Sequence, residues 1–128
     1  MGTLALIEVK FELPGIHYWP DAPPEREYLG KPHRHLFHFE LALQVKDDDR
    51  EVEYHDLLDD LRTNVGKVAM GFAHGMHYFG PMSCETIARK VLRRIQEKYG
   101  SDRSAIMKVG EDGEFNAILY YNPGGALP

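Results

Sequence analysis

Two stretches in which apolar and polar side chains alternate most strongly limit the folds open to this chain. Within residues 3–13 (TLALIEVKFEL), apolar residues alternate with charged ones from Val9 onward, and residues 34–46 (RHLFHFELALQVK) alternate over a longer span. Because successive side chains of a strand point to opposite faces of a sheet, both stretches predict half-buried strands. Pro14 and Gly15 are expected to end the first strand, and a long loop rich in proline, glycine and aromatic residues then runs to about residue 32.

The remaining elements are predicted from helical spacing and turn residues. Apolar residues at helical spacing predict one helix from about His55, and a second follows Ser83, a good N-cap, and ends near Gly100. Between them, residues 71–81 are expected to be irregular. Residues 105–109 and 114–121 predict two strands joined by a turn at Asp112 and Gly113. We therefore expect one α+β domain over residues 1–128, in which two helices cover one face of a four-stranded antiparallel sheet in the order ββααββ.

Charge and cysteine content narrow the function classes. The formal net charge of −5 is spread without long runs of one sign, whereas a nucleic-acid-binding protein needs a basic face. The basic residues within 89–94 recur at helical spacing, which favours a solvated helix face. The single cysteine, Cys84, excludes an internal disulfide, and no apolar run is long enough for a signal peptide or a membrane span. We expect a cytoplasmic protein with no nucleic-acid or membrane partner.

Three histidines are placed to share one metal ion. His33 and His35 lie two residues apart at the start of the second strand, so both rings point to the same side of the sheet. His17 lies just beyond the first strand and would face His33 if the two strands pair. Three imidazoles with one open position are typical of a catalytic zinc site. Iron, nickel or copper fit the same ligands, and the alternative is three surface histidines beside an irregular loop.

The order of these motifs resembles the 6-pyruvoyltetrahydropterin synthase family, which includes the 6-carboxytetrahydropterin synthases of queuosine and 7-deazaguanine biosynthesis. The resemblance rests on the histidine after the first strand, the pair 33–35, the helix opening 83–88 (SCETIA) and Glu111 near the last hairpin. It spans nearly the whole chain. It implies the tunnelling fold (T-fold), in which subunits pair their sheets into a barrel and commonly stack as hexamers.

The resemblance also implies roles for single residues. His17, His33 and His35 would hold Zn²⁺, and Glu111 would grip the pterin ring through two parallel hydrogen bonds. The pocket-lining segment of the family is matched by residues 82–85, so Ser83, Cys84 and Glu85 become substrate-binding candidates. For Glu111 the alternative is a solvated carboxylate in a polar turn, with Glu114 as the other candidate for the anchor.

The proton-transfer groups of the family are not matched. Leu29 stands where the family usually carries a cysteine, four residues before His33, and Ala73 stands where it has an aspartate. Glu27, His74 and His77 are therefore the candidate catalytic residues, because each can accept a proton at neutral pH or nearly so.

Three functions follow as hypotheses. The first is a zinc-dependent carbon–oxygen or carbon–carbon lyase that acts on a dihydroneopterin triphosphate-like substrate in 7-deazaguanine or pterin biosynthesis. The second is a non-catalytic protein that binds a pterin or purine-like molecule. The third is a related reaction on a different purine-like substrate. Cys84 could be recruited as a thiol, although a lone cysteine is more often an inert core residue.

Overall fold

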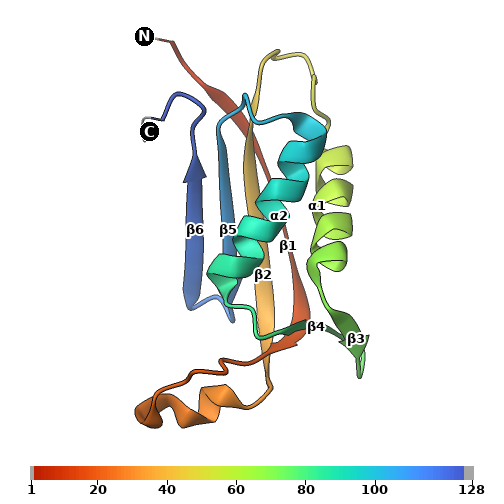
Figure 1. Ribbon diagram of the computed structural model, residues 1–128. Coiled ribbons are helices and arrows are strands. Elements are labelled where there is room, and N and C mark those ends of the chain that lie inside the picture. Colours follow the sequence, from red (N-terminus) through yellow and green to blue (C-terminus); the bar gives the residue numbers. More distant parts are fainter. Residues whose placement is uncertain (1, 126–128) are drawn as a thin grey trace.

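The computed structural model describes residues 2–125 and contains one six-stranded sheet with two α-helices on one face (Figure 1). The strand order is β3-β4-β1-β2-β5-β6. The α+β class and the order of the four long strands and two helices are confirmed, while the sheet has six strands rather than four. The elements are β1 (Ala5–His17), a 3-10 helix η1 (Pro24–Gly30), β2 (His33–Val45), α1 (Tyr54–Val68), β3 (Gly71–Ala73), β4 (Met76–Gly80), α2 (Cys84–Tyr99), β5 (Ala105–Glu111) and β6 (Phe115–Tyr121).

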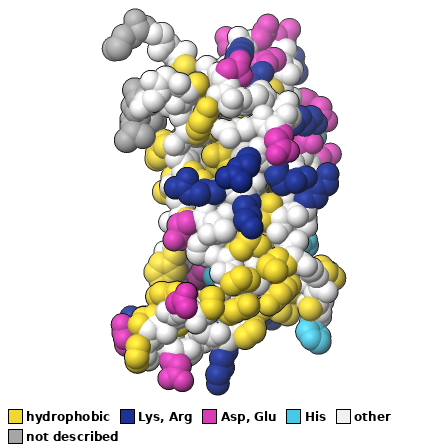
Figure 2. All heavy atoms as spheres, viewed as in Figure 1, with side chains coloured by type: hydrophobic (Ala, Val, Ile, Leu, Met, Phe, Trp, Pro, Cys, Tyr) yellow, Lys and Arg dark blue, Asp and Glu magenta, His cyan; other side chains and the backbone are white. Residues whose placement is uncertain are grey.

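The core lies between the sheet and the two helices. Alternate residues of β2 and β5 face the helical layer, among them Phe37, Phe39 and Met107, which are fully buried. The opposing helix faces are apolar at helical spacing. Figure 2 shows a belt of Lys and Arg side chains across the helical layer, which agrees with the solvated helix face expected for residues 89–94. Within residues 2–125, no helix is both long and apolar enough to cross a membrane.

The first strand is longer than predicted, and the prediction that Pro14 and Gly15 end it is wrong. β1 continues to His17 and pairs with the whole of β2, from Ala5 opposite Val45 to His17 opposite His33. Proline is tolerated at position 14 because β4 joins the other side of β1 only from Gly15 onward. A Cβ atom at Gly15 would lie 2.7 Å from a ring carbon of Phe37, so glycine lets that ring pack against the strand.

Residues 71–81 are more ordered than predicted. β3 and β4 form a short antiparallel hairpin, and β4 also pairs in parallel with the end of β1. His74 and Gly75 make the turn with φ angles of 53° and 76°. The sequence did not predict this hairpin because its strands are short. Its pairing with β1 also joins segments about sixty residues apart, which a local pattern does not reveal.

Both helices begin at the predicted places with side-chain caps. The Glu53 carboxylate accepts a hydrogen bond from the backbone N–H of Asp56 at the start of α1, and Ser83 Oγ accepts one from Thr86 at the start of α2. These caps satisfy backbone donors that have no partner in the first helical turn. The cap at Ser83 fixes the start of α2 against the end of the sheet that carries the three histidines.

Candidate metal centre

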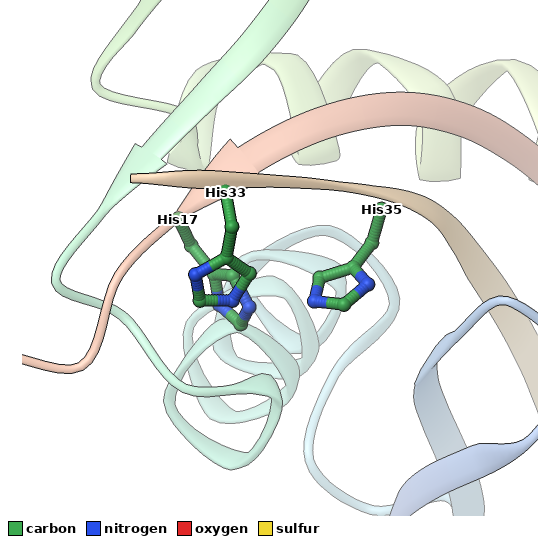
Figure 3. Close-up of side chains that lie close together, drawn as sticks. All are labelled: His17, His33 and His35. Atoms are coloured by element: carbon green, nitrogen blue, oxygen red, sulfur yellow. The ribbon is translucent and has the colours of Figure 1, made fainter. Parts of the chain in front are cut away.

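The three histidines meet at one end of the sheet. His17 is the last residue of β1, His33 is the first residue of β2 and lies directly opposite it, and His35 follows two residues later. Their rings lie on the same side of the sheet (Figure 3), and one nitrogen from each ring lies within 4.8 Å of the others. Strand pairing therefore brings together the three residues that sequence spacing singled out.

Each ring is held by a hydrogen bond at Nδ1. His17 Nδ1 lies 2.9 Å from the Met82 carbonyl oxygen, and His33 Nδ1 lies 2.8 Å from that of Lys31. His35 Nδ1 lies 2.7 Å from a carboxylate oxygen of Asp112. Because all three partners can only accept, each Nδ1 carries the hydrogen and each Nε2 keeps a lone pair in the neutral ring. This is the arrangement that orients histidines as metal ligands.

The Glu111 carboxylate faces the free nitrogens. Its Oε1 lies 3.2 Å from His17 Nε2 and its Oε2 lies 3.3 Å from His35 Nε2. The second contact is close in distance but forms no hydrogen bond, so the buried His35 Nε2 has no hydrogen-bond partner among the described residues. A buried nitrogen without a hydrogen-bond partner, within 4.8 Å of a nitrogen of each of the other two rings, is suited to bind a metal ion.

The protonation of this cluster follows from burial and charge. Burial opposes a charge on the His17 ring, but the protonated ring donates to Glu111 through Nε2 and to the Met82 carbonyl through Nδ1. These bonds and the charge of Glu111 together outweigh burial and raise the pKa of His17. Burial lowers the pKa of His33, and the two neighbouring imidazoles lower it further. The hydrogen bond from His17 lowers the pKa of Glu111, so its carboxylate is ionised at neutral pH. A divalent cation would replace the proton that His17 and Glu111 share.

The donor set fits zinc. Three neutral imidazole nitrogens are ligands that zinc prefers, and they leave a fourth position for water, a substrate or the Glu111 carboxylate. A bound zinc ion would lie between the ends of β1 and β2 and the start of α2.

A cavity of about 640 Å³ opens beside the histidines. Its size is ordinary for a small-molecule site. Apolar and aromatic side chains dominate its walls, and the Glu111 carboxylate lies beside the histidines. The lining residues are His17, Tyr18, Trp19, Leu29, His33, Pro81, Met82, Ser83, Cys84, Glu85, Glu111, Phe115, Asn116 and Ala117.

The predicted substrate-binding residues all line this cavity. Ser83, Cys84 and Glu85 come from the start of α2, and Glu111 comes from the end of β5. Cys84 Sγ donates a hydrogen bond to Glu111 Oε1 at 3.4 Å. Glu114, the other candidate for the anchor, is exposed and lies outside the lining.

The predicted catalytic residues are placed elsewhere in the single chain. Glu27 is exposed on η1, although Leu29 of the same helix lines the cavity. His74 is exposed in the turn between β3 and β4. His77 lies on β4, where its ring meets Phe72 edge-on and stacks on Phe79. Among the described residues of one chain, none of these three therefore lines the cavity beside the histidines.

Sequence reasoning missed three residues of the site. Trp19 lies in the loop after β1 and Phe115 begins β6, and both reach the cavity. The loop carries Trp19 there because its backbone N–H donates a 2.8 Å hydrogen bond to the carbonyl of Leu29, which closes the loop on itself. Asp112 was identified only as a turn residue. The aromatic residues of the loop were a visible signal for Trp19, whereas the positions of Phe115 and Asp112 depend on how the last hairpin packs.

Solved structures of similar shape were found at low sequence identity. A 6-pyruvoyl tetrahydropterin synthase from Plasmodium falciparum superimposes with a TM-score of 0.64 and 13% identity, covering 93% of this chain and 98% of that one. The fold is that of the 6-pyruvoyl tetrahydropterin synthases. The T-fold expected from the resemblance is thereby confirmed, and identity this low establishes the fold alone.

Further solved structures have the same fold. The Plasmodium vivax synthase matches with a TM-score of 0.60 and 12% identity over 94% of this chain and 99% of that one. Variants of that enzyme with a catalytic glutamate replaced by cysteine or alanine also match. An uncharacterised protein from Wolinella succinogenes matches with a TM-score of 0.56 and 12% identity over 93% of this chain and 99% of that one. No family model matches the sequence, and no curated protein matches it.

Proposed function

We propose that this protein is a zinc-dependent lyase of the 6-pyruvoyl or 6-carboxytetrahydropterin synthase type. Its substrate would resemble dihydroneopterin triphosphate, and its place would be in pterin or 7-deazaguanine biosynthesis. One observation carries the proposal: three imidazoles, each oriented through Nδ1, converge beside a cavity that also holds an ionised carboxylate. A metal with a purely structural role needs no such cavity, because structural zinc sites have all four positions filled by the protein.

The chain's own residues supply binding and orientation. Glu111 would accept two parallel hydrogen bonds from the amino-pyrimidinone edge of a pterin, which fixes the ring in its plane. Trp19 and Phe115 offer apolar surface for the faces of the ring. When bound, zinc would act as a Lewis acid that makes the hydroxyl groups of the substrate side chain more acidic.

A proton acceptor is still required, and Glu27 is our first candidate. The similar P. vivax enzyme uses a catalytic glutamate, and Glu27 lies two residues from Leu29 in the helix that borders the cavity. A shift of η1 would be needed to bring its carboxylate to the substrate. His74 and His77 do not line the cavity of their own chain, so they would act only across a subunit boundary, in an assembly of several copies.

The test combines metal analysis with turnover. Protein purified without chelators should contain stoichiometric zinc, and the His33→Ala variant should lose it. The zinc-loaded protein should convert dihydroneopterin triphosphate to a product detectable by mass spectrometry, and Glu27→Gln should slow this conversion by about 10²-fold or more if Glu27 is the base. Absence of zinc and failure to bind added zinc would refute the proposal.

A second candidate is a pterin-binding protein that does not transform its ligand. It is favoured by Leu29, whose aliphatic side chain lines the cavity where the related enzymes carry a proton-transfer cysteine. In that case neopterin should raise the melting temperature of the zinc-loaded protein, and Glu111→Gln should abolish the shift. Binding without turnover would select this candidate over the lyase.

A further inference from the structure

Asp112 joins the last hairpin to the proposed metal centre. Its carboxylate Oδ2 lies 2.7 Å from His35 Nδ1, and its Oδ1 accepts a 2.8 Å hydrogen bond from the backbone N–H of Leu36. Its own backbone N–H donates to the Leu36 carbonyl at 2.8 Å. Three contacts therefore hold this one residue against the start of β2.

The backbone at Asp112 adopts a conformation that suits this contact. Its φ angle is 55°, and that of Gly113 is 73°, so both lie in the left-handed region. Aspartate tolerates this region better than most residues, and Asp-Gly favours such a hairpin turn. A turn alone would be satisfied by asparagine at this position as well. The carboxylate of Asp112 has a second role, because its Oδ2 accepts a hydrogen bond from the His35 ring.

The three histidines differ in the partner that holds Nδ1. His17 and His33 each have a neutral backbone carbonyl, whereas His35 has a carboxylate. The two oxygens of the Asp112 carboxylate divide the work, because Oδ1 accepts from the Leu36 N–H and Oδ2 accepts from His35 Nδ1. An ionised acceptor at Nδ1 makes the opposite nitrogen a stronger donor to a metal and fixes the ring that carries it.

We propose that Asp112 is a positioning residue of the metal centre, which fixes the tautomer and ring orientation of His35 and strengthens metal binding. The inference rests on the proposed zinc site at His17, His33 and His35. Asp112 also affects the position of Glu111, because it follows Glu111 directly in the chain. Its hydrogen bond with Leu36 holds the β5–β6 turn, and with it the Glu111 carboxylate, close to the proposed metal ligands.

The experiment measures zinc affinity by competition with a chromophoric chelator in three variants. Asp112→Ala removes both carboxylate contacts, and Asp112→Asn keeps an oxygen for the Leu36 N–H but removes the charge. Asp47→Asn is the matched control, because Asp47 is also an exposed aspartate that accepts a turn N–H, that of Asp49, and it lies beyond the opposite end of β2. The melting temperature of each metal-free variant is recorded in parallel.

We expect Asp112→Ala to weaken zinc binding by about 10- to 100-fold. Asp112→Asn, which removes only the charge, should show most of this loss. The control should bind like the parent protein. With Co²⁺ in place of zinc, the visible absorption bands should change in the Asp112 variants and stay unchanged in the control, because the bands report ligand geometry.

The possible failures can be told apart. If the Asp112 variants melt at lower temperature but bind zinc like the parent and keep its Co²⁺ spectrum, Asp112 only stabilises the turn and the inference is refuted. Should Asp112→Ala fail to fold, the comparison of Asp112→Asn with the control decides the matter. If the parent protein itself binds no metal, the proposed function falls, and the role of Asp112 falls with it.

Discussion

At the scale of single residues, Cys84 has a thiol that is suited to donate a hydrogen bond rather than to transfer a proton. The side chain is buried at the start of α2 and lies against the Glu111 carboxylate. Burial raises the pKa of the Cys84 thiol far above its usual value, and the negative charge of Glu111 raises it further. The thiol therefore stays protonated, which argues against its recruitment as a proton-transfer group in place of Leu29.

This protonation state predicts slow reaction of Cys84 with thiol reagents. Because the thiolate is the reacting species, we expect the folded protein to react with Ellman's reagent at pH 8 at least about tenfold more slowly than the protein unfolded in guanidinium. The unfolded protein is the internal control, since Cys84 is the only cysteine of the chain. Equal rates in both states would show a reactive thiol and would return Cys84 to the catalytic candidates.

At the scale of elements, Asp60 fastens the two helices together. It lies on α1, and its carboxylate accepts hydrogen bonds from Lys98 Nζ at 2.8 Å and from the hydroxyl of Tyr99, both at the end of α2. Burial opposes its charge, but these two partners outweigh burial and lower the pKa of Asp60. A carboxyl group whose pKa is lower in the folded than in the unfolded protein stabilises the fold at pH values above its unfolded pKa.

We predict that Asp60→Asn lowers the free energy of unfolding by about 1–2 kcal/mol at pH 7, as expected for hydrogen bonds to a charged group. The difference from the parent should begin to shrink as the pH falls below about 4, because the unfolded parent then binds a proton at Asp60, and it should vanish below the lower pKa of the folded parent. Urea unfolding at pH 7 and pH 3 measures both effects. Asp59→Asn is the control, since Asp59 is exposed on the same helix turn, and a loss of equal size there would contradict the prediction.

How far the sequence predicted each element depends on the range of the interactions that form it. The long strands and helices were predicted because periodicity and caps such as Ser83 are local signals. The β3–β4 hairpin and the continuation of β1 through Pro14 depend on pairing between distant segments, which no local pattern encodes. The same division holds in the site: spacing within one strand singled out His33 and His35, but the contact of Asp112 with His35 spans 77 positions.

At the scale of the whole molecule, the candidate site occupies one end of the sheet, and the first and last described residues lie at the other. The loop with η1 and the β3–β4 hairpin lie at the end that carries the histidines, while the described chain begins and ends at the opposite end (Figure 1). Hydrophobic side chains gather at the histidine end in Figure 2. Trp19 and Tyr28, both in the segment between β1 and β2, are exposed. The candidate site and residues 2 and 125 thus lie at opposite ends of the sheet.

The free edge of β6 is the feature that most favours self-association. β6 ends the sheet, has no charged residue in its sequence FNAILYY, and exposes Phe115, Ile118 and Tyr120. An uncharged edge strand with exposed apolar side chains pairs readily with another chain unless a charge or a proline blocks it. The T-fold resemblance implied pairing of sheets between subunits, and this edge supplies the backbone groups for it.

We predict that the protein is an oligomer through β6 and that Ile118→Lys reduces its size. Light scattering after gel filtration should give a mass for the parent that is a multiple of 14.7 kDa and a smaller mass for the variant. Lysine on an edge strand disfavours strand pairing, because its charge would be buried against the partner. Leu4→Lys adds the same charge at another exposed apolar residue outside the sheet and should leave the mass unchanged. A parent protein that elutes as a monomer at micromolar concentration would contradict the prediction, and His74 and His77 would then have no neighbouring subunit in which to act.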